Sequence, residues 1–168
     1  MMIKRIVNPF YICFFLSNIL FYRDFDEVQT QGVIFNSIDF TSLKHIDILL
    51  EELVKPEFMR LDDSTKERVM HSLYYMNISN NQKFISFVLG YFDLLDFSEI
   101  AVDYFLKKMW EIFFDGIQLN LLKEDFNVSY KILNDNNINY ILQSESKDMS
   151  GVLDEVYGKI FKIYIMFL

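Results

Sequence analysis

The clearest pattern of apolar and polar positions lies between Asp96 and Gly116 and predicts one helix of about five turns. Large apolar side chains recur on one side of it at helical spacing: Val102, Phe105, Leu106, Met109, Ile112 and Phe113. Charges of opposite sign recur four residues apart on another side: Asp103, Lys107 and Glu111. Asp96 and Glu99 have the spacing of a capping box, and Gly116 suits a left-handed C-cap. We expect this helix to lie at the centre of the core.

A second amphipathic helix is predicted after residue 40. Thr41 or Ser42 caps it, and its apolar stripe consists of Leu43, Ile46, Leu49, Leu50 and Leu53. Pro56 disfavours helical geometry at Lys55, so we expect the helix to end there.

Two further helices are predicted before the central one. Ser64 and Glu67 form a capping box for the first, whose stripe is Val69, Met70, Leu73 and Met76. The second covers about 82–95 and is apolar around most of its circumference, which is typical of a helix covered on several sides.

The start of the chain has two interpretations. Residues 6–22 are mostly apolar and follow two cations, as in a signal peptide or a short membrane anchor. The run is short for a full span, polar residues interrupt it, and no small-residue cleavage site follows. Asn8 and Pro9 also have the pattern of an N-cap followed by proline at the first helical position. We favour a buried first helix.

The remaining segments give weaker patterns. Residues 24–39 fit a loop or a small pair of strands around Gly32, and 117–126 fit a short helix. The segment 128–143 fits either a β-hairpin or two short helices, and we favour helices because the rest of the chain is helical. A final helix is predicted to begin near Asp148 or Ser150. Its inner face consists of Val152, Val156, Ile160, Ile163 and Phe167.

Composition supports a packed helical protein. The chain has 18 phenylalanines and 10 tyrosines but only 5 glycines and 2 prolines, which indicates long packed elements and not disorder. Its 168 residues suffice for one domain. We therefore predict a single all-α domain over 1–168, a bundle of about seven to eight helices.

The formal net charge of −8 limits the classes of partner. An acidic surface repels phosphate backbones and anionic lipid headgroups, so we expect no direct binding of nucleic acid or of a membrane surface. The same surface attracts a basic protein. Alternatively, the charge only keeps an aromatic-rich protein in solution.

Side chains with catalytic or metal-binding chemistry are few. Cys13 is the only cysteine, which favours a reducing compartment, the cytoplasm, and its apolar neighbours are typical of an inert cysteine. His45 and His71 lie on different predicted helices without metal-ligand spacing, and we expect them at the surface. The sequence has no nucleophile-elbow or phosphate-loop motif. We predict no catalytic residue, no cofactor, no metal site and no enzymatic activity.

Acidic and aromatic residues gather where the two central helices join, and we predict a partner interface there: Asp93, Asp96, Glu99, Asp103, Tyr104 and Glu111. On the helical wheel Tyr104 points away from the apolar stripe, toward Glu111. An exposed tyrosine ringed by carboxylates suits a basic partner. The alternative is an ordinary solvated face.

The run LDDSTKERVMHSLYYMNISNNQKFISFVLGYFDLLDFSEIAVDYFLKKMWEIFFDG, in a small acidic chain rich in Ile, Asn, Asp and Phe, resembles the helical immunity proteins that accompany bacterial contact-dependent growth inhibition toxins. The resemblance implies a cytoplasmic antitoxin. Such a protein binds the C-terminal domain of one toxin, often a nuclease, and blocks its active site. An acidic face over a basic RNA-binding cleft would mimic phosphate.

Two other classes fit the same residues. A membrane-associated protein would use the segment 6–22 as its anchor. A viral helical-bundle regulator of protein interactions is the other, since AT-rich viral genes encode similar proportions of Ile, Asn, Tyr and Phe.

Overall fold

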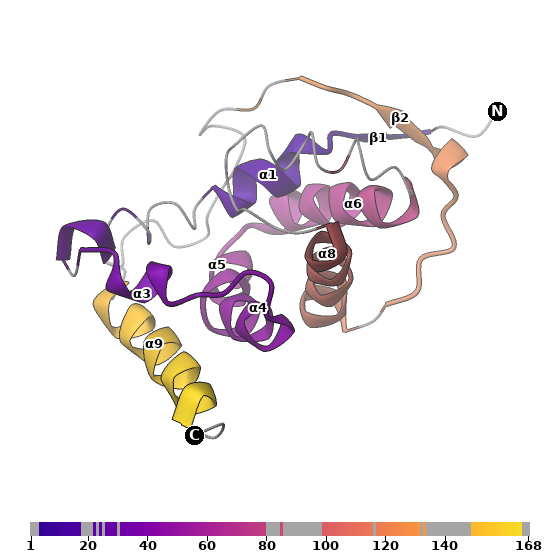
Figure 1. Cartoon of the computed structure of the whole chain (residues 1–168). Helices are drawn as coiled ribbons and strands as arrows, with labels where there is room; N and C mark the ends of the chain where they lie inside the picture. Colours follow the sequence, from indigo (N-terminus) through magenta and orange to yellow (C-terminus); the bar gives the residue numbers. More distant parts are fainter. Residues whose placement is uncertain are drawn as a thin grey trace.

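The computed structural model describes residues 4–17, 22, 24, 26–29, 31–79, 85, 99–115, 117–131, 133 and 149–165. These residues form a mostly helical structure with one small sheet, which confirms the predicted all-α class (Figure 1). The elements in chain order are β1 (Arg5–Val7), α1 (Phe10–Leu16), α3 (Val33–Asn36), α4 (Leu43–Leu49), the π-helix η1 (Leu50–Val54), α5 (Lys55–Met59), α6 (Asp63–Ser79), α8 (Glu99–Phe114), the 3-10 helix η2 (Lys123–Asp125), β2 (Phe126–Val128) and α9 (Met149–Ile165).

Helix α1 is the buried first helix that the sequence predicts. The Asn8 side-chain oxygen accepts a hydrogen bond from the Phe10 backbone N–H at 3.0 Å, and the Asn8 amide donates to the Lys131 carbonyl at 2.7 Å. The helix buries Phe10, Ile12, Cys13, Phe15 and Leu16. It packs on α6, where the Ser72 hydroxyl donates to the Pro9 carbonyl at 3.0 Å. Within the described part of the chain, every helix is too short or too polar to cross a membrane.

Helix α6 begins one residue before the predicted capping box. The Asp62 carboxylate accepts a hydrogen bond from the Thr65 N–H at 2.6 Å and the helix starts at Asp63, so the predicted Ser64–Glu67 box is wrong. Asp62 lies just outside the helix, where its carboxylate can reach the free N–H groups of the first turn. The predicted apolar stripe is correct at Val69, Leu73 and Met76, which are all buried.

The chain stays helical from Leu43 to Met59, so the predicted end at Lys55 is wrong. Ser42 caps α4 as predicted, with its hydroxyl accepting from the His45 N–H at 3.5 Å. The π-helix η1 follows, and the Lys55 N–H donates five residues back to the Leu50 carbonyl. The hydrogen-bond register therefore shifts just before Pro56, which lies in the first turn of α5. Pro56 therefore occupies one of the first two positions of α5, where proline is tolerated.

Helix α8 confirms the central amphipathic pattern. Its residues Val102, Phe105, Leu106 and Met109 are buried. Lys107 pairs with Asp103 at 2.7 Å as predicted, but Glu111 pairs with Lys108, three residues away, at 3.1 Å. Asp115, with φ 52, is the left-handed residue after the helix. Asp96, Gly116 and the predicted helix at 82–95 lie outside the described residues, apart from the buried, helical Ile85.

Phenylalanine rings from three helices join α1, α5 and α8 at the centre of the core. Phe58 stacks on Phe113 with ring centroids 4.3 Å apart and planes 6° apart. Its ring also makes edge-to-face contacts with Phe15 at 6.0 Å and with Phe114 at 5.3 Å. Edge-to-face and stacked rings stabilise a core beyond simple area burial.

The segment 24–39 contains short helices joined by turns and irregular backbone at 31–32 and 37–39, so the expected strand pair is wrong and the expected loop is correct only at these residues. Residues 26–29 are helical, and α3 begins after Gly32, whose φ of 75 is left-handed. The buried Asp26 carboxylate accepts from the Phe35 N–H at 2.8 Å. This contact holds the turn around Gly32, which the local apolar pattern does not encode.

The small sheet joins segments that lie far apart in the chain. β1 and β2 are parallel, with Arg5 opposite Phe126 and Val7 opposite Val128. Val7 and Phe126 pack with Tyr75 of α6 in a second, smaller core. Of the helix expected over 117–126, only the three-residue 3-10 helix η2 is present, and 117–122 are irregular. The helix favoured for 128–143 is wrong at its described start, because Val128 belongs to a strand that depends on a distant partner. Residues 134–143 lie outside the described residues.

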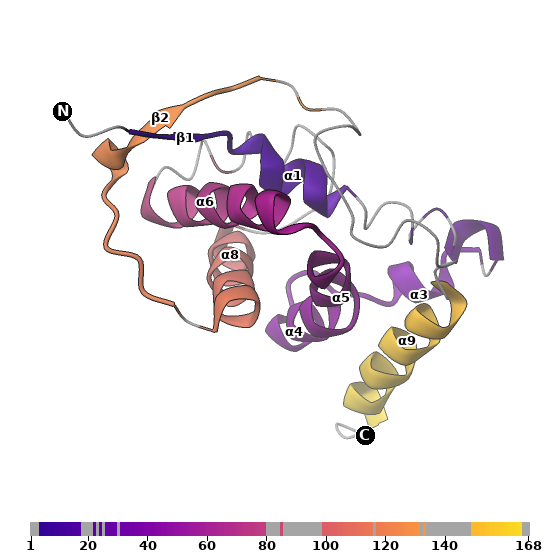
Figure 2. The same cartoon turned by 180° about the vertical axis from the view of Figure 1, so that it is seen from behind.

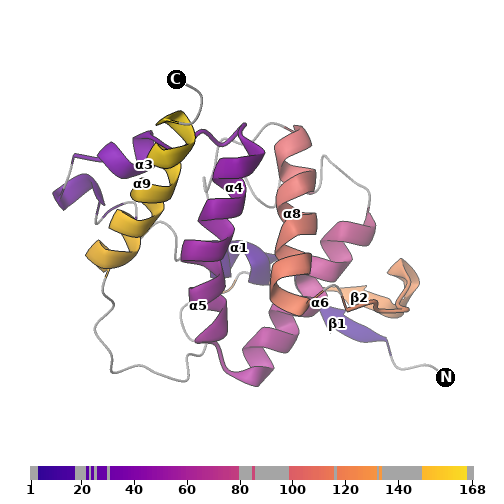
Figure 3. The same ribbon diagram turned by 90° about the horizontal axis from the view of Figure 1, so that it is seen from below.

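Helix α9 begins at Met149, as predicted, and buries Leu153, Val156 and Ile160. It contacts α3, α4 and η1. The helices α9, α4–η1–α5 and α8 lie side by side (Figure 3). From behind, α9 lies at one end of the molecule and the sheet at the other (Figure 2). Phe167 of the predicted inner face lies outside the described residues.

Candidate functional site

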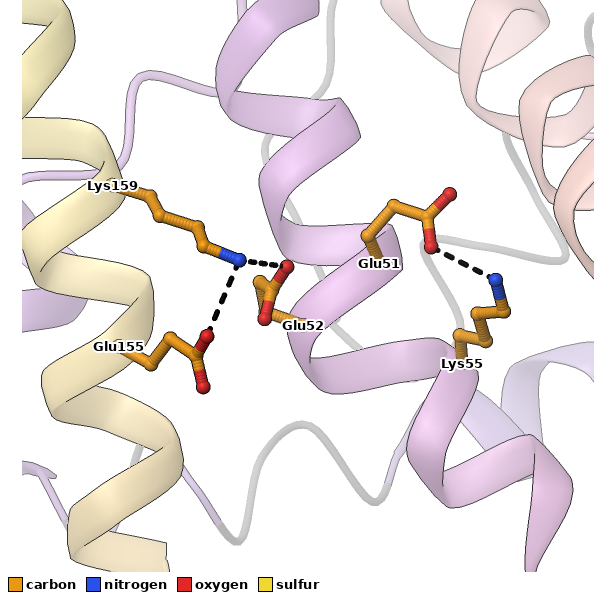
Figure 4. Close-up of polar contacts among 5 residues, drawn as sticks. All are labelled: Glu51, Glu52, Lys55, Glu155 and Lys159. Atoms are coloured by element: carbon orange, nitrogen blue, oxygen red, sulfur yellow. Dashed lines mark hydrogen bonds and ion pairs between the residues drawn. The ribbon is translucent and has the colours of Figure 1, made fainter.

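Charged side chains cross the layer formed by α9, α4–η1–α5 and α8. We call its acidic members the carboxylate band: Asp47, Glu51, Glu52, Asp103, Glu111 and Glu155. The π-helix η1 lies at the centre of this band, and its neighbours Glu51 and Glu52 extend to opposite sides of it (Figure 4). π-helical turns are rare in proteins, and those that occur are often found at functional sites.

On the α9 side of the band, two carboxylates share one lysine. The Lys159 ammonium donates to Glu52 and lies 3.3 Å from the Glu155 carboxylate (Figure 4). The hydrogen bond to Glu52 raises the pKa of Lys159, with Glu155 adding to the effect and partial burial opposing it. This triad ties α9 to η1, and it leaves one negative charge in excess.

On the α8 side, each ion pair joins two residues of the same helical segment, either η1–α5 or α8. Lys55 binds Glu51 at 3.0 Å, and Lys108 binds Glu111 at 3.1 Å. The pKa of Lys108 is raised, first by its hydrogen bond with Glu111 and also by the charges of Glu111, Asp47 and Glu51. Lys108 therefore lies in a field of carboxylates from three elements.

Tyr104 links α8 to α4. Its hydroxyl donates to the Asp47 carboxylate at 2.7 Å, and its half-buried ring packs against the main core. Burial raises the pKa of Tyr104 to about 12, helped by the hydrogen bond and charge of Asp47 and by the charge of Glu111. The expected exposure of Tyr104 is wrong, because the helical wheel of α8 alone cannot show that α4 covers this side. Its expected carboxylate surroundings are correct for Glu111, whose charge acts on the phenol.

The other predicted interface residues have different outcomes. Asp103 and Glu111 lie on α8, each paired with a lysine of its own helix. Glu99 is the first residue of α8, and the structure describes its backbone only. Asp93 and Asp96 lie outside the described residues. An interface through these last three residues remains a prediction.

Sequence reasoning missed the four carboxylates of the band that α4, η1 and α9 supply. Glu51, Glu52 and Glu155 belong to segments that the sequence treats as separate helices, and packing alone brings them together. One local signal was available: the apolar pattern of Leu50, Leu53 and Val54 continues to Phe58, past Pro56, as in an unbroken helix.

Both histidines are less accessible than expected. His45 is 3% exposed, and its Nδ1 accepts a hydrogen bond from the Asp39 N–H at 2.9 Å, so the predicted surface position is wrong. Burial lowers the pKa of His45 and of the half-buried His71. Burial raises the pKa of the Cys13 thiol, which keeps it protonated and unreactive. Among the described residues, no group of His, Cys, Asp and Glu has the arrangement of a metal site.

The band keeps a negative charge after its internal pairs are formed. Its lysines, Lys55, Lys107, Lys108 and Lys159, are fewer than its carboxylates, and the hydrogen-bond partner of Asp47 is a phenol. The surplus of carboxylates lets the band bind cationic groups.

Comparison of the chain with protein-family models, with curated proteins and with solved structures gave no match.

Proposed function

We propose that this chain is an immunity protein that binds a basic bacterial toxin domain through the carboxylate band and covers its active site. The observation that carries the proposal is the surplus of carboxylates across α9, η1 and α8. The resemblance to immunity proteins of contact-dependent growth inhibition systems supplies the class of partner. In this function the protein acts in the cytoplasm and catalyses no reaction itself.

The exposure of the ion pairs supports such a role. The side chains of Glu51 and Glu111 are 45% and 61% exposed. Exposed pairs of this kind are weak, so arginine or lysine of a partner can compete with Lys55 and Lys108 for the same carboxylates. Charge complementarity of this type mainly accelerates association and selects the partner.

A neutralisation assay tests the function. The proposal requires a toxin domain encoded beside this gene. The neighbouring basic protein domain is expressed from an inducible promoter, with and without this chain, and cell survival is counted. We expect survival only when both are present, together with a complex that co-purifies. Survival of cells that express the toxin domain alone, or death of cells that express both, would refute the proposal.

Paired variants test the surface. Glu51→Gln with Glu111→Gln removes two carboxylates of the band, and Glu67→Gln with Glu124→Gln removes two exposed carboxylates of α6 and η2. Each variant loses two negative charges, so the two variants have the same net charge. We expect the band variant to associate about tenfold more slowly at low salt, with a weaker dependence on salt, and the control variant to change much less. Equal effects would show that only the net charge acts and would reject the band as the binding surface.

A further inference from the structure

The outer face of α9 carries a pair of exposed aromatic rings. Tyr157 and Phe161 are 37% and 51% exposed. Their rings lie one helical turn apart, with centroids 6.1 Å apart and planes 16° apart. The opposite face of the helix, with Leu153, Val156 and Ile160, is already buried against the rest of the protein. Exposed aromatic residues on one helix face are typical of contact surfaces.

Gly158 lies beside this ring pair, about 60° around the helix from Phe161, and the fold gives no reason for a glycine there. A Cβ atom added there would meet nothing within 4 Å, so no neighbour within the chain requires a glycine. Glycine destabilises a helix interior relative to alanine. Its presence on an aromatic face fits the close approach of a second helix, for which a missing side chain leaves room.

The charges on this face are complementary to themselves. Asp154 and Lys162 are both exposed, and neither forms an ion pair within the described part of the chain. They lie four residues before and four residues after Gly158, which is about 6 Å along the axis in each direction. In an antiparallel pair of α9 helices that cross at Gly158, Asp154 of each copy lies level with Lys162 of the other.

We propose that two copies of this chain associate through α9, in an antiparallel, two-fold symmetric contact centred on Gly158. The symmetry gives two ion pairs between Asp154 and Lys162, and it places Tyr157 and Phe161 of both copies along the same side of the contact. α9 lies at one end of the molecule, so its outer face is accessible to a second copy (Figure 2). The contact does not use the paired carboxylates of η1 and α8, so variants at Asp154, Gly158 and Lys162 test it separately from the Glu51 and Glu111 variants that test toxin binding.

A charge swap tests this arrangement. Asp154 and Lys162 are about 12 Å apart within one helix and do not contact each other there. Asp154→Lys alone and Lys162→Asp alone should each weaken the dimer by about tenfold, because like charges then face each other twice. The double variant should restore the wild-type dissociation constant. Sedimentation equilibrium of the full chain, from micromolar to millimolar concentration, measures all four proteins, and circular dichroism checks their folding.

Gly158→Gln supplies a second, independent test. The new side chain points into open space in the monomer, so the melting temperature at low concentration should stay equal or rise. At the crossing point it prevents close approach, and the variant should sediment as a monomer. A wild-type chain that is monomeric at millimolar concentration, a double charge variant as weak as the single ones, or an unchanged dimer in Gly158→Gln would each overturn the proposal.

Discussion

Replacing Phe58 by leucine should lower the free energy of unfolding by about 2 to 3 kcal/mol. Phe58 is 3% exposed and touches three rings: it stacks on Phe113 and meets the edges of Phe15 and Phe114. Leucine keeps most of the buried apolar area but loses these ring contacts, each of which contributes about 0.5 to 1.5 kcal/mol. The loss is shared by α1, α5 and α8, so unfolding should remain one cooperative transition.

Urea unfolding, followed by circular dichroism and by the fluorescence of Trp110, the only tryptophan, measures this change. The ring centroids of Trp110 and Phe114 are 4.7 Å apart, so the emission of Trp110 reports on the same region. For a chain of this size the melting temperature should fall by about 5 to 10 °C. Phe161→Leu, at an exposed position and at low protein concentration, is the control and should cost less than about 0.5 kcal/mol. A loss below about 1 kcal/mol in Phe58→Leu would refute the described ring packing.

Two further predictions concern titrating groups. Because burial holds the pKa of His45 below its ordinary value of 6.5, its contribution to stability is complete above pH 6.5 and is lost as the pH falls through the lowered pKa. His45→Gln should therefore lose less stability than the wild type between pH 7.5 and 5 in urea titrations, and parallel curves would contradict this. Tyr104→Phe removes the hydrogen bond to Asp47 and should cost about 1 kcal/mol. It should also abolish the phenol that titrates at about 12 in ultraviolet absorbance, whereas Tyr157→Phe should leave that titration in place.

Local signals predicted the parts of the fold that depend on neighbours in sequence. The stripe of α8, the Ser42 cap, the Asn8 cap and the start of α9 all depend on side chains within a few residues, and each is confirmed. Helical spacing also predicts which side of α8 is buried, because the core contacts one stripe of large side chains.

The errors arise where contacts come from elsewhere in the chain. β2 has only three residues and pairs with β1, so its own letters carry no strand signal. His45 becomes buried because the turn at Asp39 folds back over it, and Tyr104 meets Asp47 of another helix. For the candidate site, the excess of carboxylates follows from composition, but the band itself arises from the packing of η1 between α8 and α9.

The pairing of β1 with β2 has a consequence for the nascent chain. Ribosomes add roughly 5 to 20 residues per second, so Arg5–Val7 leaves the exit tunnel on the order of ten seconds before Phe126–Val128. Over that interval the backbone donors and acceptors of β1 have only solvent or chaperones to satisfy them. The side-chain amide of Asn8 likewise has no final acceptor until the Lys131 carbonyl has been synthesised. Residues 5–8 are therefore synthesised well before the residues that become their final partners.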